Sequence, residues 1–403
     1  MELFWLEHKK LWRKKIVKIC VLLCFVYCVI FGSILSFQWF CFGSSDDYTS
    51  AFGNNFDGYT VIKDSQEYAL SFGGELTDET LQKIVSDYQQ MEADGMGEEL
   101  EKTDWQIVNS WLGTLYPELR DTSNYKTMIS YVDPDKLTGF YERRQQVLDE
   151  FLEVSGQVGA EKEFLHQIER KVEKPFRYEW VEGWSTLLGS MVADLGVVMA
   201  LFLGIVLSSL FAGEWHDNTS TLVLTTRNGW GKIALAKILT GLAFTVELFA
   251  LLAVSNVISQ LFFMGTAGWD MPIQNIKLIA VAPMNMLQAE IYEYAFVLLG
   301  AIGFAGIVMF ISAAVKNNVL TLLLSLAVVY GPMMIAEYLP YKMQKALDLI
   351  PLVGSSTDIF RTNTFRIFGK LIWSPYLLIT IPVLIGILCM PFAIKSWSRR
   401  MKA

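Results

Sequence analysis

The chain has 403 residues, 53% of them hydrophobic, and its long apolar runs with few charges exclude a single soluble globular core. Its net charge of −8 is unevenly divided, because residues 41–190 hold 29 acidic and 13 basic residues while the remainder holds 12 acidic and 20 basic residues. An acidic soluble segment is therefore joined to a basic membrane body, and nothing in this pattern predicts binding to nucleic acid.

The N-terminal segment MELFWLEHKKLWRKK alternates apolar and basic residues at helical spacing. This pattern predicts an amphipathic helix in the membrane interface, with aromatic side chains among the lipids and basic side chains among the head groups. The apolar run that follows is too long for a cleavable signal peptide and lacks an A-x-A site, so residues 1–41 are expected to be retained as interfacial helix and first span. The interfacial residues are Trp5, Lys9, Lys10, Trp12 and Arg13.

Residues 42–186 are the acidic segment, and we expect them to fold as an α-rich (α+β) extracellular domain between the first two spans. The runs TVI and YALSF, on either side of KDSQE, predict a β-hairpin over residues 60–72. Capping and apolar spacing predict helices after the hairpin. These helices are expected to begin near Thr77, Asp104, Pro134 and residue 160, the last of them ending near residue 173.

Six apolar runs are long enough to cross about 30 Å of hydrocarbon, which predicts an α-helical integral membrane protein with six spans, five of them within 187–403. Fourteen Lys and Arg residues fall in the short segments on the N-terminal side of the membrane, so both termini are expected to be cytosolic in a cell membrane. Segment 337–374 interleaves basic and apolar residues and predicts an interfacial or re-entrant helix on the outer face. The runs are about 17–40, 187–212, 238–264, 294–315, 319–336 and 375–394.

Two carboxylates lie within these runs or at their ends. Asp194 is near the outer end of the second run, where we expect it to be interfacial, and Glu247 is in the middle of the third. An acidic side chain inside a membrane is costly and by default faces protein or water. Glu247 is therefore either a proton or substrate carrier or a side chain satisfied by an interhelical hydrogen bond.

The sequence contains no G-x-x-x-x-G-K-[ST] motif, and the string GWGKI at 229–233 lacks both the upstream glycine and the final Ser or Thr. No Cys/His spacing fits a zinc site, and no nucleophile elbow or H-E-x-x-H motif occurs. We therefore expect a transport subunit rather than an enzyme, with no metal or cofactor of its own and with its energy supplied by a partner or an ion gradient.

The stretch FAGEWHDNTSTLVLTTRNGWGKIALAK, residues 211–237, resembles the inner loop of ABC-2 type permeases, the membrane subunits of type V ABC exporters. That pattern has an aromatic residue, a glutamate, Gly-Thr, a Leu-rich turn, a basic residue, and a lysine that opens the third span. Asn218 stands where the glycine is usual, and Thr226 replaces the usual proline before the arginine. The basic start, the six spans and the large insertion found in some Gram-positive bacterial members extend the resemblance. The matching residues are Phe211, Glu214, Thr219, Leu222, Val223, Leu224, Arg227, Lys232 and Lys237.

The resemblance implies that the cytosolic loop 213–237 holds a coupling helix that docks on a separate ATP-binding subunit, where ATP and Mg²⁺ would bind. Glu214 would tie this helix to the N-terminal helix through Lys9, Lys10 or Arg13. Two permease copies, identical or paralogous, would form the pathway among the membrane lipids. The residues expected to couple to the ATP-binding subunit are Glu214, Trp215, His216, Asp217, Thr219, Arg227, Lys232 and Lys237.

The implied cargo is amphipathic or hydrophobic, such as an antimicrobial peptide, a lipid or a drug, and export of such a peptide would give resistance to it. Two other interpretations stay open. The chain could be an ion-coupled secondary transporter that uses Glu247, although it shows no internal repeat. It could also be a membrane-anchored sensor or binding protein whose acidic ectodomain captures a cationic peptide or metal ion.

Overall fold

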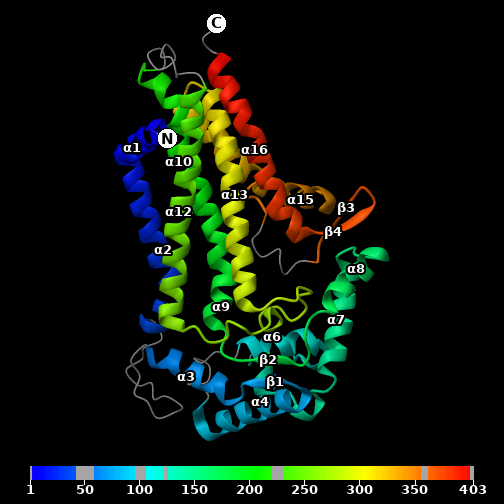
Figure 1. The fold of residues 1–403 in the computed structure, drawn as a ribbon. Helices are drawn as coiled ribbons and strands as arrows, with labels where there is room; N and C mark the ends of the chain where they lie inside the picture. The colour runs from blue at the N-terminus through cyan, green and yellow to red at the C-terminus, as the bar shows by residue number, and fades with distance from the viewer. Residues whose placement is uncertain are drawn as a thin grey trace.

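The computed structural model describes residues 2–41, 59–96, 106–121, 123, 126–219, 231–354 and 362–399. A bundle of long helices carries a smaller, mostly helical layer at one end, while α1 and the end of α16 lie at the opposite end (Figure 1). The two parts are described in turn, beginning with the long helices.

Five described helices are long and apolar enough to cross a membrane, so the chain is a multi-pass α-helical membrane protein. Each coincides with one of the predicted apolar runs, although α10 begins five residues after the start of its run and α13 begins eight residues before the start of its run. These helices are α10 (Val192–His216), α12 (Lys232–Met264), α13 (Met286–Ala314), α14 (Asn318–Ala336) and α16 (Ser374–Arg399).

The N-terminal segment forms two helices, α1 (Glu2–Arg13) and α2 (Lys15–Cys41), which meet at Lys14. The amphipathic helix predicted from the first fifteen residues is therefore confirmed, and the first apolar run is a single helix of 27 residues. Both helices pack along the outer side of α12 (Figure 1).

Helices α13 and α16 approach each other closely because glycines face one another where they cross. A Cβ on Gly306 would lie 2.4 Å from the carbonyl oxygen of Gly386, and a Cβ on Gly303 would lie 2.3 Å from that of Pro382. Small residues allow two membrane helices to gain dispersion contacts between their backbones. The close crossing of α13 and α16 therefore requires glycine at these positions, because any larger side chain would clash with the facing backbone.

The segment predicted to lie outside the cell, for which we keep the name ectodomain, is α-rich with a two-stranded antiparallel sheet, in which Gly74 pairs with Tyr178 and Leu76 with Phe176. Its regular elements are α3 (Tyr59–Ser71), β1 (Gly74–Leu76), α4 (Asp78–Met91), α6 (Gln106–Leu115), α7 (Phe140–Val154), α8 (Ala160–Glu169), β2 (Phe176–Tyr178) and α9 (Glu182–Thr186). Single turns of 3₁₀- or π-helix are η1 (Glu92–Met96), η2 (Pro117–Leu119), η3 (Met128–Ser130), η4 (Pro134–Lys136), η5 (Leu187–Met191) and, beyond the ectodomain segment, η6 (Ile273–Asn275).

The hairpin predicted over residues 60–72 is wrong, because this stretch is the helix α3. Ile62, Ser65 and Ala69 are all buried, and their spacing of three and four residues is that of one helical face. The alternation that suggested strands was thus the weaker of two periodicities in a short segment.

The predicted helix starts are confirmed in part. The hydroxyl of Thr77 accepts a hydrogen bond from the backbone N–H of Thr80 and caps α4. Pro134 opens only a 3₁₀ turn, and α7 begins after Gly139, whose φ of 70° favours glycine. The last helix ends at Glu169, earlier than predicted, and Asp104 lies outside the described residues.

The hydrophobic core of the ectodomain also includes residues 265–285, the connection between α12 and α13. The indole N–H of Trp111 donates to the carbonyl of Asn275 at 2.9 Å, and that of Trp180 donates to the carbonyl of Met264 at 2.9 Å. These buried bonds satisfy both indoles and join segments far apart in the sequence. The unit predicted as 42–186 is thus completed by a membrane-helix connection.

In its described residues, 337–354 and 362–374, segment 337–374 contains one short helix, α15 (Tyr341–Leu347), and a hairpin of β3 (Thr364–Ile367) and β4 (Lys370–Trp373). The interfacial or re-entrant helix expected here is therefore only partly correct, because the alternating basic and apolar residues of 364–373 form strands. The hairpin contacts the ectodomain where the Thr364 hydroxyl donates to the Gln157 amide oxygen at 2.9 Å.

Arg144 holds the ectodomain on the 265–285 segment, and its side chain is fully buried. It donates to Glu169 at 2.6 Å, to the carbonyl of Leu278 at 2.6 Å and to that of Ala280 at 3.2 Å. Burial raises the pKa of Glu169, but hydrogen bonds from Lys174 and Arg144 outweigh this effect, and the pKa is lowered.

Replacing Arg144 with Met is expected to cost about 3–5 kcal/mol of unfolding free energy, because the charge pair and both carbonyl contacts are lost in a buried place. Arg170→Met is the matched control, since Arg170 is exposed and its pair with Glu163 is worth less than about 1 kcal/mol. Thermal unfolding of the full chain in detergent measures both. Equal losses in the two variants would contradict this role of Arg144.

Candidate functional site

The candidate site lies where α10 ends and α12 begins, on both sides of residues 220–230. Those residues, including Arg227 of the predicted coupling loop, lie outside the described residues. The two flanks are described in full. They bring Glu214 and Lys237 of the predicted coupling loop together with Lys10 of the N-terminal helix.

A Schellman motif ends α10 and sets the direction of the chain. The N–H of Asn218 donates to the carbonyl of Trp215 at 3.2 Å, and the N–H of Thr219 donates to that of Glu214 at 3.0 Å. Asn218 adopts a left-handed conformation, with φ of 57°, which asparagine tolerates better than most residues. Asn218 thus keeps a conformation that glycine adopts most readily.

The motif turns Thr219 back onto Glu214, so that its hydroxyl donates to the Glu214 carboxylate. This carboxylate also accepts from Lys10 Nζ at 2.6 Å and from Lys237 Nζ at 2.7 Å. Lys237 Nζ lies 2.8 Å from a second carboxylate, that of Glu7. We call these five residues, Glu7, Lys10, Glu214, Thr219 and Lys237, the Glu214 cluster.

The Glu214 cluster joins three helices in a nearly dry place. The side chains of Glu214 and Lys237 are only 3% and 2% exposed, and they come from α10 and α12. Lys10 and Glu7 come from α1. Two cations and two anions balance each other, as buried charges require, and removal of one partner from such a pair leaves an uncompensated charge.

Further lysine contacts show how crowded this junction is. Burial lowers the pKa of Lys10, but its hydrogen bond with Glu214 and the negative charges of Glu214, Glu7 and Asp217 together outweigh this, and the pKa is raised. Lys14, at the break between α1 and α2, donates to the hydroxyl of Ser209 at 3.0 Å. Its pKa is lowered by burial first, and then by the nearby charges of Lys237 and Lys10.

The structure selects among the partners that the sequence left open for Glu214. Of Lys9, Lys10 and Arg13, only Lys10 reaches Glu214 in the described part of the chain, while Lys9 and Arg13 point to the exposed side of α1. Trp5 is also exposed, as expected for a side chain placed among lipids.

Trp215 connects α10 to two other helix ends. Lys316, between α13 and α14, lies 4.5 Å from the centre of its ring, a cation–π contact. Trp397 of α16 packs edge-on against Trp215 at 6.2 Å and against Phe211 at 5.5 Å, measured between ring centres. The end of the bundle is therefore held together around α10.

Three of the predicted coupling residues point outward instead. His216 and Asp217 are exposed and lie 3.1 Å from each other, and Lys232 is exposed at the start of α12. Among the described residues they make no hydrogen bond or ion pair with the Glu214 cluster, although the charge of Asp217 helps to raise the pKa of Lys10, and they remain accessible to a partner. The site thus has an inner part that joins helices and an outer, charged part.

Glu247 is bonded to the N-terminal helix. The indole N–H of Trp12 donates to its carboxylate at 3.1 Å, and His8 Nε2 lies 3.2 Å away. Trp12 also packs edge-on against Phe244, with ring centres 5.8 Å apart. An interhelical hydrogen bond is therefore present, as one of the two sequence interpretations required. Asp194 lies exposed near the start of α10.

The sequence analysis missed two buried carboxylates. Glu290 and Glu293, which are 4% and 0% exposed, lie on the first turns of α13, before the apolar run that was predicted to start at 294. Asn285 and Gln288 form a capping box that places the helix start at Met286. The pattern N-x-x-Q was the signal that could have found it.

The described residues contain no group of three His, Cys, Asp or Glu side chains that could hold a metal ion. No family model, curated protein or solved structure gives a significant match to this chain. The function of the chain must therefore be inferred from the geometry of the site and from the residues of the loop itself.

Glu214→Gln is expected to cost about 3–5 kcal/mol of unfolding free energy, because Lys237 keeps its charge in a buried place with only Glu7 to balance it. The double variant Glu214→Gln/Lys237→Met should lose less than the two single variants combined, since it removes both deeply buried charges and leaves only Glu7 and Lys10, whose side chains are 16% and 51% exposed. Thermal unfolding in detergent gives all three values.

The exposed neighbour Asp217→Asn is the control, and its effect should stay within about 0.5 kcal/mol. A Glu214→Gln variant as stable as Asp217→Asn would show that the Glu214 cluster does not hold the helices together.

Proposed function

We propose that this chain is the membrane-spanning permease subunit of an ATP-driven exporter of the ABC-2 type, which works with a separate ATP-binding subunit. The observation that carries the proposal is the Glu214 cluster, which ties α1 to both flanks of residues 220–230. A force applied by a soluble partner to this loop would reach α1, α10 and α12 together. Such a partner would supply the ATP and Mg²⁺ chemistry that the sequence of this chain lacks.

Six spans, with both termini in the cytosol, are part of the proposal. The sixth would be α2, whose 27 residues extend about 40 Å at 1.5 Å per residue. The basic residues of the short connections favour this orientation by the positive-inside rule. The ectodomain would then lie outside the cell, at the end of the bundle far from the Glu214 cluster (Figure 1).

The packing of α10 suggests how the force would be passed on. The hydroxyl of Ser312 on α13 donates to the carbonyl of Ser208 at 2.7 Å and accepts from the backbone N–H groups of Phe211 and Ala212 at 3.1 Å. These bonds couple α10 to α13 one turn away from Glu214. At their other ends, α12 and α13 are joined by residues 265–285, inside the ectodomain core. A tilt of α10 and α12 would therefore move the ectodomain.

A second permease copy is proposed as the partner within the membrane. The outward faces of α14 and α16 are apolar and exposed, and α14 is the less covered of the two. Val319, Leu323 and Met334 of α14 are among the exposed side chains. Either lipid or a second copy of this chain could cover them, and an exporter pathway between two copies would use one such face.

The cargo is proposed to be amphipathic or hydrophobic, in keeping with the apolar bundle. A cationic peptide at the acidic ectodomain stays a prediction. The contacts of Glu247 with Trp12 and His8 are those of helices packed together, so they give the ion-coupled alternative no specific support.

Purification from native membranes tests the partner directly. The chain, tagged at its C-terminus and extracted in mild detergent, should carry a P-loop ATPase at one copy per permease, as measured by quantitative mass spectrometry. A preparation that keeps other membrane complexes intact but contains no ATPase would count against the exporter proposal and leave the loop resemblance without a partner.

Lys10→Ala is expected to leave the complex assembled but to reduce cargo-stimulated ATP hydrolysis several-fold, because α1 loses its bond to Glu214 while Lys237 keeps the carboxylate paired. Lys9→Ala is the matched control on the same helix, since Lys9 is exposed and does not contact Glu214. Hydrolysis rates of the reconstituted complex, with and without cargo, provide the measurement. Identical rates in the two variants would remove Lys10 from the coupling path.

A further inference from the structure

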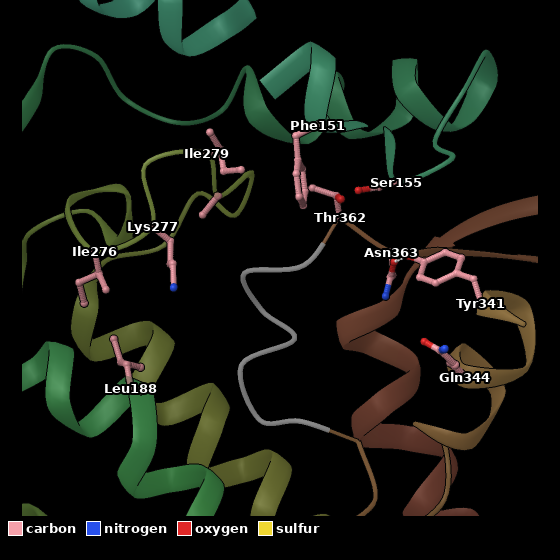
Figure 2. A pocket seen from close by; sticks show the side chains of 12 residues that line it. Phe151, Ser155, Leu188, Ile276, Lys277, Ile279, Tyr341, Gln344, Thr362 and Asn363 are labelled. Carbon is pink, nitrogen blue, oxygen red and sulfur yellow. Dashed lines mark hydrogen bonds between the residues drawn. The ribbon is translucent and has the colours of Figure 1, made fainter. Parts of the chain in front are cut away.

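A cavity of about 610 Å³ lies between the ectodomain and the outer parts of the membrane body. Figure 2 shows Phe151 and Ser155, from the end of α7, on one side of it, and Tyr341 and Gln344 of α15 across from them. The side chain of Lys277 reaches into the space between (Figure 2). This volume is within the range of sites that bind small molecules.

The lining of this cavity is mainly apolar, with a single charge. Phe151, Leu188 and Ile279 contribute apolar side chains to the lining. Lys277 is the only charged side chain among the lining residues that the structure describes. The lining has no carboxylate in that part of the chain, although the ectodomain segment has a large excess of acidic residues. A ligand with an apolar body and one negative charge fits this lining, whereas a cationic ligand does not.

Exposed aromatic side chains lie close in sequence to the lining residues Tyr341, Gln344, Thr362 and Asn363. Tyr338, Tyr376 and Phe368 are 85%, 60% and 102% exposed, and they lie after α14, at the start of α16 and in the turn between β3 and β4. Tyr341, which lines the cavity, is itself 47% exposed. Tyrosine and other aromatic residues gather at the boundary between membrane and water. The cavity therefore opens at the depth where amphiphiles in a membrane place their head groups.

We propose that this cavity binds a single-chain amphiphile with an anionic head group. Its chain lies against Phe151, Leu188 and Ile279, and its head group pairs with Lys277. A free fatty acid and an anionic lysophospholipid share this chemistry. The site does not depend on the proposed exporter function, since binding needs neither a partner subunit nor ATP.

The experiment uses the full chain in nanodiscs of zwitterionic lipid and a photoreactive analogue of oleate. Cross-linked peptides identified by mass spectrometry should include the one that carries Lys277. Unlabelled oleate should compete about tenfold better than oleylamine, which has the same chain and a positive charge, because a charge-assisted hydrogen bond with Lys277 is lost. Lysophosphatidylglycerol and lysophosphatidylcholine, compared in the same way, show whether a phosphate diester head group is accepted as well as a carboxylate.

Two variants locate the binding. A Cβ on Gly189 would meet no atom within 4 Å, so Gly189→Phe can fill the cavity without a clash and should abolish cross-linking. Gly196→Phe is its control on α10, where a Cβ is equally unopposed but does not line the cavity. Lys277→Gln should weaken competition by oleate about tenfold and remove the preference over oleylamine. Lys342→Gln, an exposed lysine on α15 outside the lining, should change neither.

The proposal would be overturned if oleylamine competed as well as oleate. It would also be overturned if the Lys277→Gln variant still preferred oleate over oleylamine to the same extent. Cross-linking that survives Gly189→Phe would do the same. If the Gly189→Phe protein fails to fold, the comparison of Lys277→Gln with Lys342→Gln decides. Both lysines are exposed, so these substitutions should not affect stability.

Discussion

The arrangement of the helices depends on one set of ion pairs, in which the carboxylate of Glu214 binds both Lys10 and Lys237. An amphipathic helix at a membrane surface is held mainly by its apolar face and is otherwise free to move. Here that helix, α1, is fixed by the half-exposed Lys10 and by Glu7 to the buried charges of Glu214 and Lys237 on α10 and α12. Because such charges are stable only when all partners are present, the three helices behave as one body as long as the Glu214 cluster is complete.

The same helices are joined again at the far end of the bundle. The connection of α12 to α13 lies in the ectodomain core, where the buried Arg144 and Trp111 hold it through its backbone carbonyls. Between the two ends, Ser312 and the glycine crossing of α13 with α16 keep the helices close. A change at the Glu214 cluster would therefore reach the ectodomain through these contacts. The amphiphile site proposed around Lys277 lies between the ectodomain and α15.

Much of this fold could be predicted from the sequence, because a long apolar run has few alternatives to a membrane helix. The helices predicted from the apolar runs were correct to within a few residues except at the start of α13, where Glu290 and Glu293 interrupt the apolar pattern but are buried. The helix α3 was misread because its buried face, from Ile62 to Ala69, is short. Glu214 could be singled out by its place in the loop, but choosing Lys10 over Lys9 and Arg13 requires the crossing angle of α1, which no local pattern encodes.

One distance measurement tests most directly whether the Glu214 cluster makes α1 part of the moving body. Spin labels at the exposed positions Leu6 on α1 and Leu239 on α12, in a chain without its native cysteines, report the separation of these helices. Our account predicts one narrow distance distribution in the presence of the proposed ATP-binding subunit, unchanged by ATP, and a broad one after Glu214→Gln. A wild-type α1 that moves away from α12 when ATP binds would contradict it.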